Sequence, residues 1–172
     1  MPKDELALWV QAAQKGDQQA MAALIENSQN SLFKFCLFLC SRAELAEDLC
    51  QEAFLRAFLN INNLKNPQAF QGWLFQCARN AFLDFVKSPK NKGHDEISDL
   101  PHNDLNAEDY QTSFEVRKTL QALDPEERVL LVLIDIQGFS YAEAAKITGL
   151  SEPGMPSRLH RIRLNFMGKH EK

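Results

Sequence analysis

The chain has 172 residues, enough for one modest domain or two small ones. Its apolar content of 45% is sufficient for packed cores, and its formal charge of −4 argues against a protein that coats nucleic acid through net positive charge. The longest apolar run, Val129 to Ile134, is too short for a membrane span or a secretory leader. We therefore expect a cytoplasmic protein without membrane insertion.

The N-terminal segment has the three- and four-residue apolar spacing of amphipathic helices. A first helix is expected to stop at Gly16, and Asp17 is expected to cap a second one. The segment Ser31 to Cys40 is dense in Leu, Phe and Cys, which predicts a helix buried by its neighbours.

Two further amphipathic segments lie between residues 42 and 87, separated by a polar break at residues 62–67. Ser41 with Glu44 is typical of an N-terminal capping pair, so the first of these helices is expected to begin near Arg42. Pro89 is expected to end the second. The spacing places a polar group on the outer side of the first helix: Asp48, Gln51, Glu52 and Arg56. Four polar residues fall outside the apolar face of the second: Arg79, Asn80, Asp84 and Lys87.

From Ser88 to Thr112 the periodic pattern is lost. This stretch holds six acids against two lysines, with two prolines and a glycine, a composition typical of a solvated linker.

The C-terminal part has clear helix boundaries. A short helix is expected around Val116 to Leu123, and Asp124-Pro125 predicts the start of another that ends at Gln137-Gly138. Ser140 with Glu143 predicts a capped helix that ends at Gly149, with Tyr141, Ala144, Ala145 and Ile147 facing inward. The last helix is expected to start after Ser151, with Met155, Leu159, Ile162 and Phe166 on its inner side. Its outward residues are then Ser157, Arg158, His160, Arg161 and Arg163.

Two short helices joined by a turn that contains glycine are typical of a DNA-binding helix-turn-helix. From Pro153 onward the chain has five basic residues against one acid, opposite to the global balance. Arginine contacts phosphate or donates two hydrogen bonds to a guanine edge, so this face is a candidate DNA-binding surface.

Neither metal nor catalytic chemistry is indicated. Four cysteines lie in helical pattern without paired spacing: Cys36, Cys40, Cys50 and Cys77. They are expected to be buried thiols. The four histidines show no ligand or triad spacing, and no glycine-rich loop is present to cradle phosphate, so no cofactor, metal or enzyme activity is expected.

The motifs together resemble a known family. Residues 46–54, AEDLCQEAF, are followed by Gly72-Trp73-Leu74 and by Ala78-Arg79-Asn80 with Asp84, and this order is similar to region 2 of the sigma-70 family. Residues 139–145, FSYAEAA, and 157–161, SRLHR, resemble region 4. The spacing is similar to that of the extracytoplasmic-function (ECF) branch, the promoter-recognition subunits of bacterial RNA polymerase.

The resemblance implies an all-α fold of two small helical domains joined by a flexible acidic linker. Residues 1–88 would form the region 2-like domain, 89–112 the linker and 113–172 the region 4-like helix-turn-helix domain. It implies core RNA polymerase as a partner, through the clamp helices of the largest subunit and the flap, and promoter DNA as the other. An anti-sigma factor is a further expected partner, and the free chain is expected to be a monomer.

The resemblance also implies roles for the polar residues. Asp48, Gln51, Glu52 and Arg56 would dock on the polymerase clamp. The break from Leu64 to Gln68 would pocket a flipped base of the −10 element, and the remaining −10 contacts would come from the second amphipathic helix. The −10 set is Asn66, Pro67, Gln68, Arg79, Asn80 and Lys87. The −35 set is Ser157, Arg158, His160, Arg161 and Arg163.

One position departs from the family pattern, because Pro156 stands where a basic residue is usual. If the last helix ran from Ser151, a proline this far inside would cost roughly 3 kcal/mol or shift the helix start to Pro156 itself. Two alternatives share parts of the pattern. A sigma-like mimic that sequesters an anti-sigma factor would have the same fold, and a stand-alone helix-turn-helix regulator would explain residues 113–172 alone.

Overall fold

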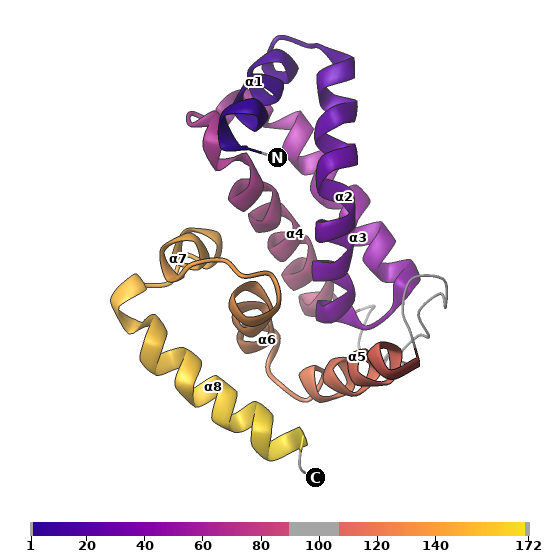
Figure 1. The fold of residues 1–172 in the computed structure, drawn as a ribbon, viewed down its shortest axis with the longest axis vertical. Helices are drawn as coiled ribbons and strands as arrows, with labels where there is room; N and C mark the ends of the chain where they lie inside the picture. Colours follow the sequence, from indigo (N-terminus) through magenta and orange to yellow (C-terminus); the bar gives the residue numbers. More distant parts are fainter. Residues whose placement is uncertain (1, 90–106, 171–172) are drawn as a thin grey trace.

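A computed structural model describes residues 2–89 and 107–170, and within these residues the chain is helical and has no strand (Figure 1). The all-α expectation is confirmed. Four helices precede the segment that is not described: α1 (Lys3–Gln14), α2 (Gln18–Cys40), α3 (Ala43–Leu59) and α4 (Phe70–Lys87). Four follow it: α5 (Ala107–Leu120), α6 (Pro125–Leu131), α7 (Tyr141–Thr148) and α8 (Met155–His170). Short 3-10 turns, Ile61–Asn63 and Pro67–Ala69, connect α3 to α4.

The first four helices form a bundle in which α2, α3 and α4 run side by side and α1 lies against one end (Figure 1). Its core holds fully buried aromatic and aliphatic side chains from α2 and α4, including Phe35, Leu39, Phe70 and Leu74. Ser31 to Cys40, expected to be a buried helix, is the second half of the single long helix α2.

Several predicted helix ends are confirmed. The side chain of Asp17 accepts hydrogen bonds from the first backbone N–H groups of α2. Ser140 and Glu143 form a reciprocal capping box at α7, and Gly149 ends α7 in the left-handed conformation at φ 76°.

The predicted role of Ser41 is wrong. Ser41 ends α2 in the left-handed region at φ 56°, and Arg42 holds the cap position of α3 without a side-chain hydrogen bond. The Ser41 hydroxyl instead bonds to the second half of the chain, where it donates to the Arg117 carbonyl at 3.5 Å and accepts from Gln121 at 3.2 Å. A partner this distant in sequence cannot be identified from local spacing.

The two halves of the chain pack directly on each other. Helix α7 lies on α4, and α6 lies between α4 and α8 (Figure 1). The ring of Phe75 on α4 meets Phe139 edge-on at 5.0 Å between centroids. Helix α4 packs against α2, α3, α6 and α7, and it buries residues beyond its single predicted apolar face: Phe75, Ala78, Phe82 and Leu83.

Hydrogen bonds also join the halves. Ser31 and Gln137 bond reciprocally, at 3.0 Å between side chains and at 3.3 Å from the Gln137 amide to the Ser31 carbonyl. The buried guanidinium of Arg128 donates to the Leu39 carbonyl near the end of α2 at 2.6 Å. Gln137 reaches Ser31 because the helix after Leu131 continues as a π turn, Val132–Ile136, that shifts the register of its last residues.

Helix α8 accommodates the unusual proline. A 3-10 turn, Glu152–Gly154, precedes it, and the α-helix begins at Met155. Pro156 is therefore in the first turn, where its missing N–H has no helical acceptor to lose. The start expected directly after Ser151 is wrong, whereas the alternative of a shifted start at Pro156 differs from the observed start by one residue. Tyr141, expected to face inward, is 36% exposed.

Helix α5 begins at Ala107, so residues 107–112, expected to be linker, are helical. Most of the predicted acidic linker lies outside the described residues. None of the described helices is long and apolar enough to cross a membrane.

Candidate nucleic-acid and polymerase interface

The outer face of α3 presents the predicted polymerase-docking group. Asp48 and Gln51 are exposed and Glu52 is half-buried, as the spacing predicts. Leu55 and Leu59 extend this face with large exposed apolar side chains, 55% and 74% exposed. These two leucines were not predicted, although their positions one and two turns after Gln51 and Glu52 would have identified them.

Arg56 is bound within the protein. Its guanidinium bonds Glu52 at 2.9 Å and Asp84 of α4 at 3.0 Å. The hydrogen bond to Glu52, followed by that to Asp84, raises the pKa of Arg56. Arg56 therefore joins α3 to α4 and orients Glu52, and a partner that bound its guanidinium would have to compete with two carboxylates.

The predicted base-reading loop, residues 64–68, is short and held at several points. The side-chain oxygen of Asn66 accepts the Gln68 backbone N–H at 3.1 Å and caps the following turn. The Gln68 side chain donates to Asp4 of α1 at 3.0 Å. Asn66 and Gln68 are nevertheless exposed, and their side chains have polar atoms left for a nucleobase edge.

This loop opens onto a cavity of about 690 Å³. Its walls are rich in side-chain amides and include one large aromatic ring: Asn27, Asn66, Gln68, Gln71, Gln76 and Trp73. Amides supply both donors and acceptors, and Trp73 packs against the core but is only partly buried. Glu143 and Lys146 of α7 complete the wall from the other half of the chain.

The remaining residues of the −10 set lie along α4. Arg79 and Asn80 are half-buried and bonded to each other, with the guanidinium donating to the amide oxygen at 3.0 Å. Lys87 is exposed at the end of the helix. They lie toward the other end of α4 from residues 64–68, so the −10 set forms a band along the helix rather than one cluster.

Helix α8 presents the predicted −35 group outward. Met155, Leu159 and Ile162 are buried on the inner side of the helix. All five members of the −35 set are exposed: Ser157, Arg158, His160, Arg161 and Arg163. Arg163 differs from the rest because it forms a two-pronged ion pair with Asp135, at 2.9 and 2.5 Å. Hydrogen bonding to Asp135 is the largest cause of the raised pKa of Arg163. Arg163 is thus engaged with the π turn, whereas Arg161 has no ion-pair partner within the described residues.

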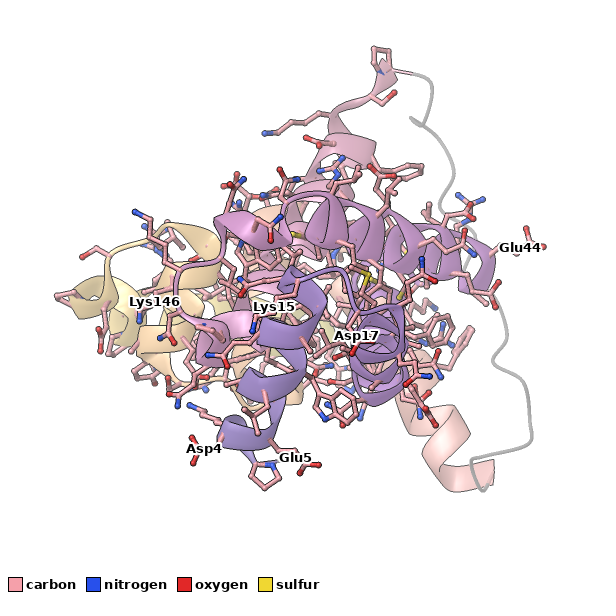
Figure 2. All side chains as sticks on the ribbon, turned by 90° about the horizontal axis from the view of Figure 1, so that it is seen from above. Asp4, Glu5, Lys15, Asp17, Glu44 and Lys146 are labelled. Carbon is pink, nitrogen blue, oxygen red and sulfur yellow. The ribbon has the colours of Figure 1, made fainter. Side chains whose placement is uncertain are left out.

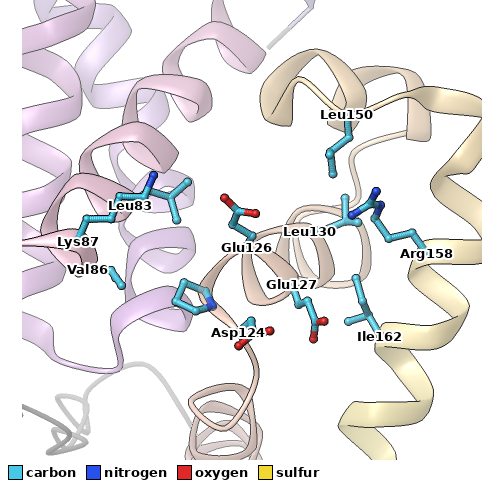
Figure 3. Close-up of a pocket in the computed structure, with 11 residues that line it drawn as sticks. Leu83, Val86, Lys87, Asp124, Glu126, Glu127, Leu130, Leu150, Arg158 and Ile162 are labelled. Atoms are coloured by element: carbon cyan, nitrogen blue, oxygen red, sulfur yellow. The ribbon is translucent and has the colours of Figure 1, made fainter. Parts of the chain in front are cut away.

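A second cavity, about 410 Å³, brings together residues from both predicted DNA-binding sets (Figure 3). Lys87 of α4 lines one side and Arg158 of α8 the other. Three acids at the start of α6 lie between them: Asp124, Glu126 and Glu127. In this arrangement the cationic side chains of the two sets face acidic side chains of the same chain.

The four cysteines are free thiols on three helices, α2, α3 and α4. A hydrogen bond with Cys50, and then burial, raises the pKa of Cys36, and burial raises the pKa of Cys40 to about 11. Cys36 and Cys40 are therefore protonated at neutral pH, the opposite of what a metal site needs. No cluster of three potential ligands for a metal ion occurs in the described part of the chain.

Residues 24–91 match the sigma-70 region 2 family, and residues 113–165 match sigma-70 region 4. The chain is 33% identical to the ECF RNA polymerase sigma factor SigM of Bacillus subtilis over 139 residues, covering 78% of this chain and 85% of SigM. It is 32% identical to SigE of Mycolicibacterium smegmatis over 172 residues, covering 90% of this chain but 65% of that protein. The chain belongs to the ECF sigma factor family.

Two solved structures share the fold. CnrH in complex with the cytosolic domain of CnrY aligns with a TM-score of 0.74 over 95% of both chains, at 23% identity. The sigma factor RpoE in complex with the anti-sigma factor NepR, from Bartonella quintana, aligns with a TM-score of 0.68 over 86% of this chain and 94% of RpoE, at 24% identity.

The two matched segments contain all the candidate site residues. The matched segment 24–91 contains the outer face of α3, the loop of residues 64–68 and α4. The matched segment 113–165 contains α6, α7 and the arginines of α8. Helix α1, which contacts the loop through Asp4, precedes the first matched segment.

Proposed function

We propose that this ECF sigma factor binds core RNA polymerase, directs it to promoters through −10 and −35 contacts, and promotes initiation by trapping an unpaired base. As a sigma factor, the chain acts as a transcription initiation factor. The observation that carries the residue-level proposal is the amide-rich cavity of about 690 Å³ beside residues 64–68. The side-chain amides and Trp73 in its wall all belong to the first half of the chain, so they stay together whether or not α7 covers α4.

Core polymerase docks on the outer face of α3. Asp48, Gln51 and Glu52 supply the polar part of that surface, and Leu55 and Leu59 supply the apolar part. Exposed ion pairs contribute about 0–1 kcal/mol each, so the apolar part is needed for a stable complex. We therefore expect Leu55 and Leu59 to contribute most of the free energy of docking.

The −10 element is read as single-stranded DNA. A base that leaves the duplex enters the cavity, where Asn66 and Gln68 meet its edge and Trp73 offers a ring for stacking. Stacking contributes about 1–3 kcal/mol per base, which offsets an unstacking cost of a few kcal/mol. Arg79, Asn80 and Lys87 hold the backbone of the same strand along α4.

The −35 element is read by α8 in the major groove, with Arg158 and Arg161 as the main contacts. By their names the two elements lie about 25 base pairs apart, roughly 85 Å of duplex at ~3.4 Å per base pair. Lys87 and Arg158 line one cavity in the free chain, so one promoter cannot reach both sets in this arrangement. We infer that the two halves separate when the chain joins polymerase and DNA.

The test is to mix the purified chain with bacterial core polymerase and genomic DNA fragments, then sequence the transcripts. Discrete start sites that share two upstream motifs are the expected result. A matched pair of variants assigns the docking face: Leu59→Asp is expected to abolish core binding, whereas Leu8→Asp, at an equally exposed leucine of α1, leaves it intact.

Two results would contradict the proposal. Core binding without any transcript would favour a sigma-like mimic that binds an anti-sigma factor, a partner that the fold similarity to the complex of RpoE with the anti-sigma factor NepR also suggests. A chain that does not bind core, but binds duplex DNA through residues 113–172, would favour a stand-alone helix-turn-helix regulator.

A further inference from the structure

Helix α1 lies along the loop of residues 64–68 and contacts it at both of the helix's ends. At its C-terminal end, the side-chain amide of Gln14 donates two hydrogen bonds, to the carbonyls of Ile61 and Leu64, both at 2.9 Å. At its N-terminal end, Asp4 accepts the side chain of Gln68 at 3.0 Å. Figure 2 shows Asp4 and Lys15, the neighbour of Gln14, at opposite ends of this helix.

The helix is a firm support for these contacts. Leu6, Val10 and Ala13 bury its inner face in the core of the bundle, with at most 5% of each exposed. Asp4 and Gln14 are ten helical residues apart, so the helix holds the two contacting residues roughly 15 Å apart at ~1.5 Å per residue. Lys3 and Leu6 also line the amide-rich cavity itself.

The two bonds of Gln14 fix the loop at its start. Leu64 is the first residue of the loop, and Ile61 begins the turn before it. Their carbonyls accept from one amide group, which uses both of its N–H donors. Without it, two backbone acceptors lose a partner in a half-buried position, and the loop that carries Asn66 loses its only side-chain tie at this end among the described residues.

We propose that Gln14 is a positioning residue for −10 recognition, and that α1 sets base specificity by holding the loop of residues 64–68 at both ends. This inference rests on the proposed function of that loop. The region 2 match begins at residue 24, so neither Gln14 nor Asp4 lies in the matched segment. Gln14 does not touch the base; it acts through the backbone position of Leu64 and thereby of Asn66.

The test is Gln14→Glu, which keeps the side-chain shape but replaces the donor by an acceptor that repels both carbonyls. Gln11→Glu is the matched control, because it adds the same charge at an exposed position of the same helix. Each chain is joined to core polymerase and assayed on a promoter library randomised in the −10 element with a fixed −35 element. A second library randomises the −35 element.

The expected result is that Gln14→Glu lowers base discrimination at one or two −10 positions by about tenfold, the scale of one directional contact to a base edge. Its −35 preference stays at the wild-type value, and Gln11→Glu keeps both preferences. Gln14→Lys, which restores donors to the carbonyls, recovers most of the lost −10 discrimination. The positive charge that Gln14→Lys adds strengthens binding to all −10 sequences alike, so it does not change the ratio of activities between preferred and altered −10 sequences.

Asp4→Ala provides a variant that does not endanger the fold, because Asp4 is exposed. Asp4→Ala is expected to lower base discrimination at the same −10 positions, but by less than Gln14→Glu does. Three outcomes would overturn the inference: wild-type −10 discrimination in both Gln14→Glu and Asp4→Ala, an equal loss on all promoters that follows a fall in melting temperature, or no recovery in Gln14→Lys. If the wild-type chain itself gives no sequence-dependent transcription, the proposed function is wrong and the inference is overturned with it.

Discussion

Arg161 and Arg163 lie two residues apart on α8, and the structure predicts different roles for them. Arg161 is exposed without an ion-pair partner in the described residues, whereas Arg163 holds Asp135 by two hydrogen bonds. Arg161→Ala should remove a contact to a base edge, worth about 1–3 kcal/mol, or roughly 5- to 150-fold in affinity for the preferred −35 sequence. Preference at that position should relax accordingly.

Arg163→Ala should leave the −35 preference unchanged. To contact DNA, Arg163 must first give up a partly exposed ion pair worth about 0.2–1 kcal/mol. Its removal also leaves the Asp135 carboxylate near the DNA phosphates, so affinity should fall by a similar factor for all sequences. Adding Asp135→Asn to Arg163→Ala should remove this repulsion and restore most of the affinity.

The assay is competitive binding of polymerase holoenzyme to promoters with single changes in the −35 element, at several salt concentrations. If Arg161 contacts phosphate instead of a base, Arg161→Ala should lower the salt slope by about 0.9 and keep the preference. Equal relaxation of the −35 preference by Arg161→Ala and Arg163→Ala would refute the reasoning from the ion pair.

Three further predictions concern the loop, the junction of the halves and a thiol. Asn66→Ala should relax the −10 preference in the library assay, whereas Asn63→Ala, at an exposed neighbour, should not. A relaxed preference in Asn63→Ala but not in Asn66→Ala would show that residues 64–68 are not the loop that reads the base. Arg128→Met should lower the free energy of unfolding by about 3 kcal/mol, because it leaves the buried carbonyls of Leu120 and Leu123 without this donor; a loss under 1 kcal/mol in urea denaturation would contradict this. Cys40, with its pKa raised to about 11, favours the folded state below its unfolded pKa and loses that contribution as the pH rises from about 9 to 11. Cys40→Ala should therefore flatten the fall in stability over this window, and an unchanged slope would count against it.

Much of the fold follows from local sequence signals. Asp17, the Ser140–Glu143 box and Gly149 set helix ends through neighbours within a few residues, so their pattern was sufficient. Leu159 and Ile162 repeat at helical spacing and are buried as predicted. The exposure of the −35 set follows from the same periodicity.

The remainder depends on contacts between distant residues. Ser41 looked like a cap for α3 but bonds Gln121, and Phe75 packs against both Phe35 and Phe139. The engagement of Arg163 with Asp135 likewise depends on the π turn, which hydrophobic spacing does not reveal. Pro156 looked disruptive because the preceding 3-10 turn was not predicted. In each case the local pattern was compatible with the structure, but the partner was set by tertiary packing.

The packing of the two halves has the same origin. The family resemblance implied two domains, composition predicted a linker between them, and nothing in the sequence showed that α7 would cover part of α4. The consequence for function is direct, because Lys87 and Arg158 line one cavity in the free chain and must separate to engage one promoter.

The measurement that tests this account most directly is a footprint of the holoenzyme on a promoter selected from the genomic fragments, with permanganate to detect unpaired thymines. If both halves contact the promoter as proposed, we expect two protected blocks on the same DNA molecule, about 25 base pairs apart, with unpaired thymines only at the downstream block. Protection of a single block, or protection without unpaired bases, would contradict the claim that both halves read DNA together and that the cavity beside residues 64–68 traps a base.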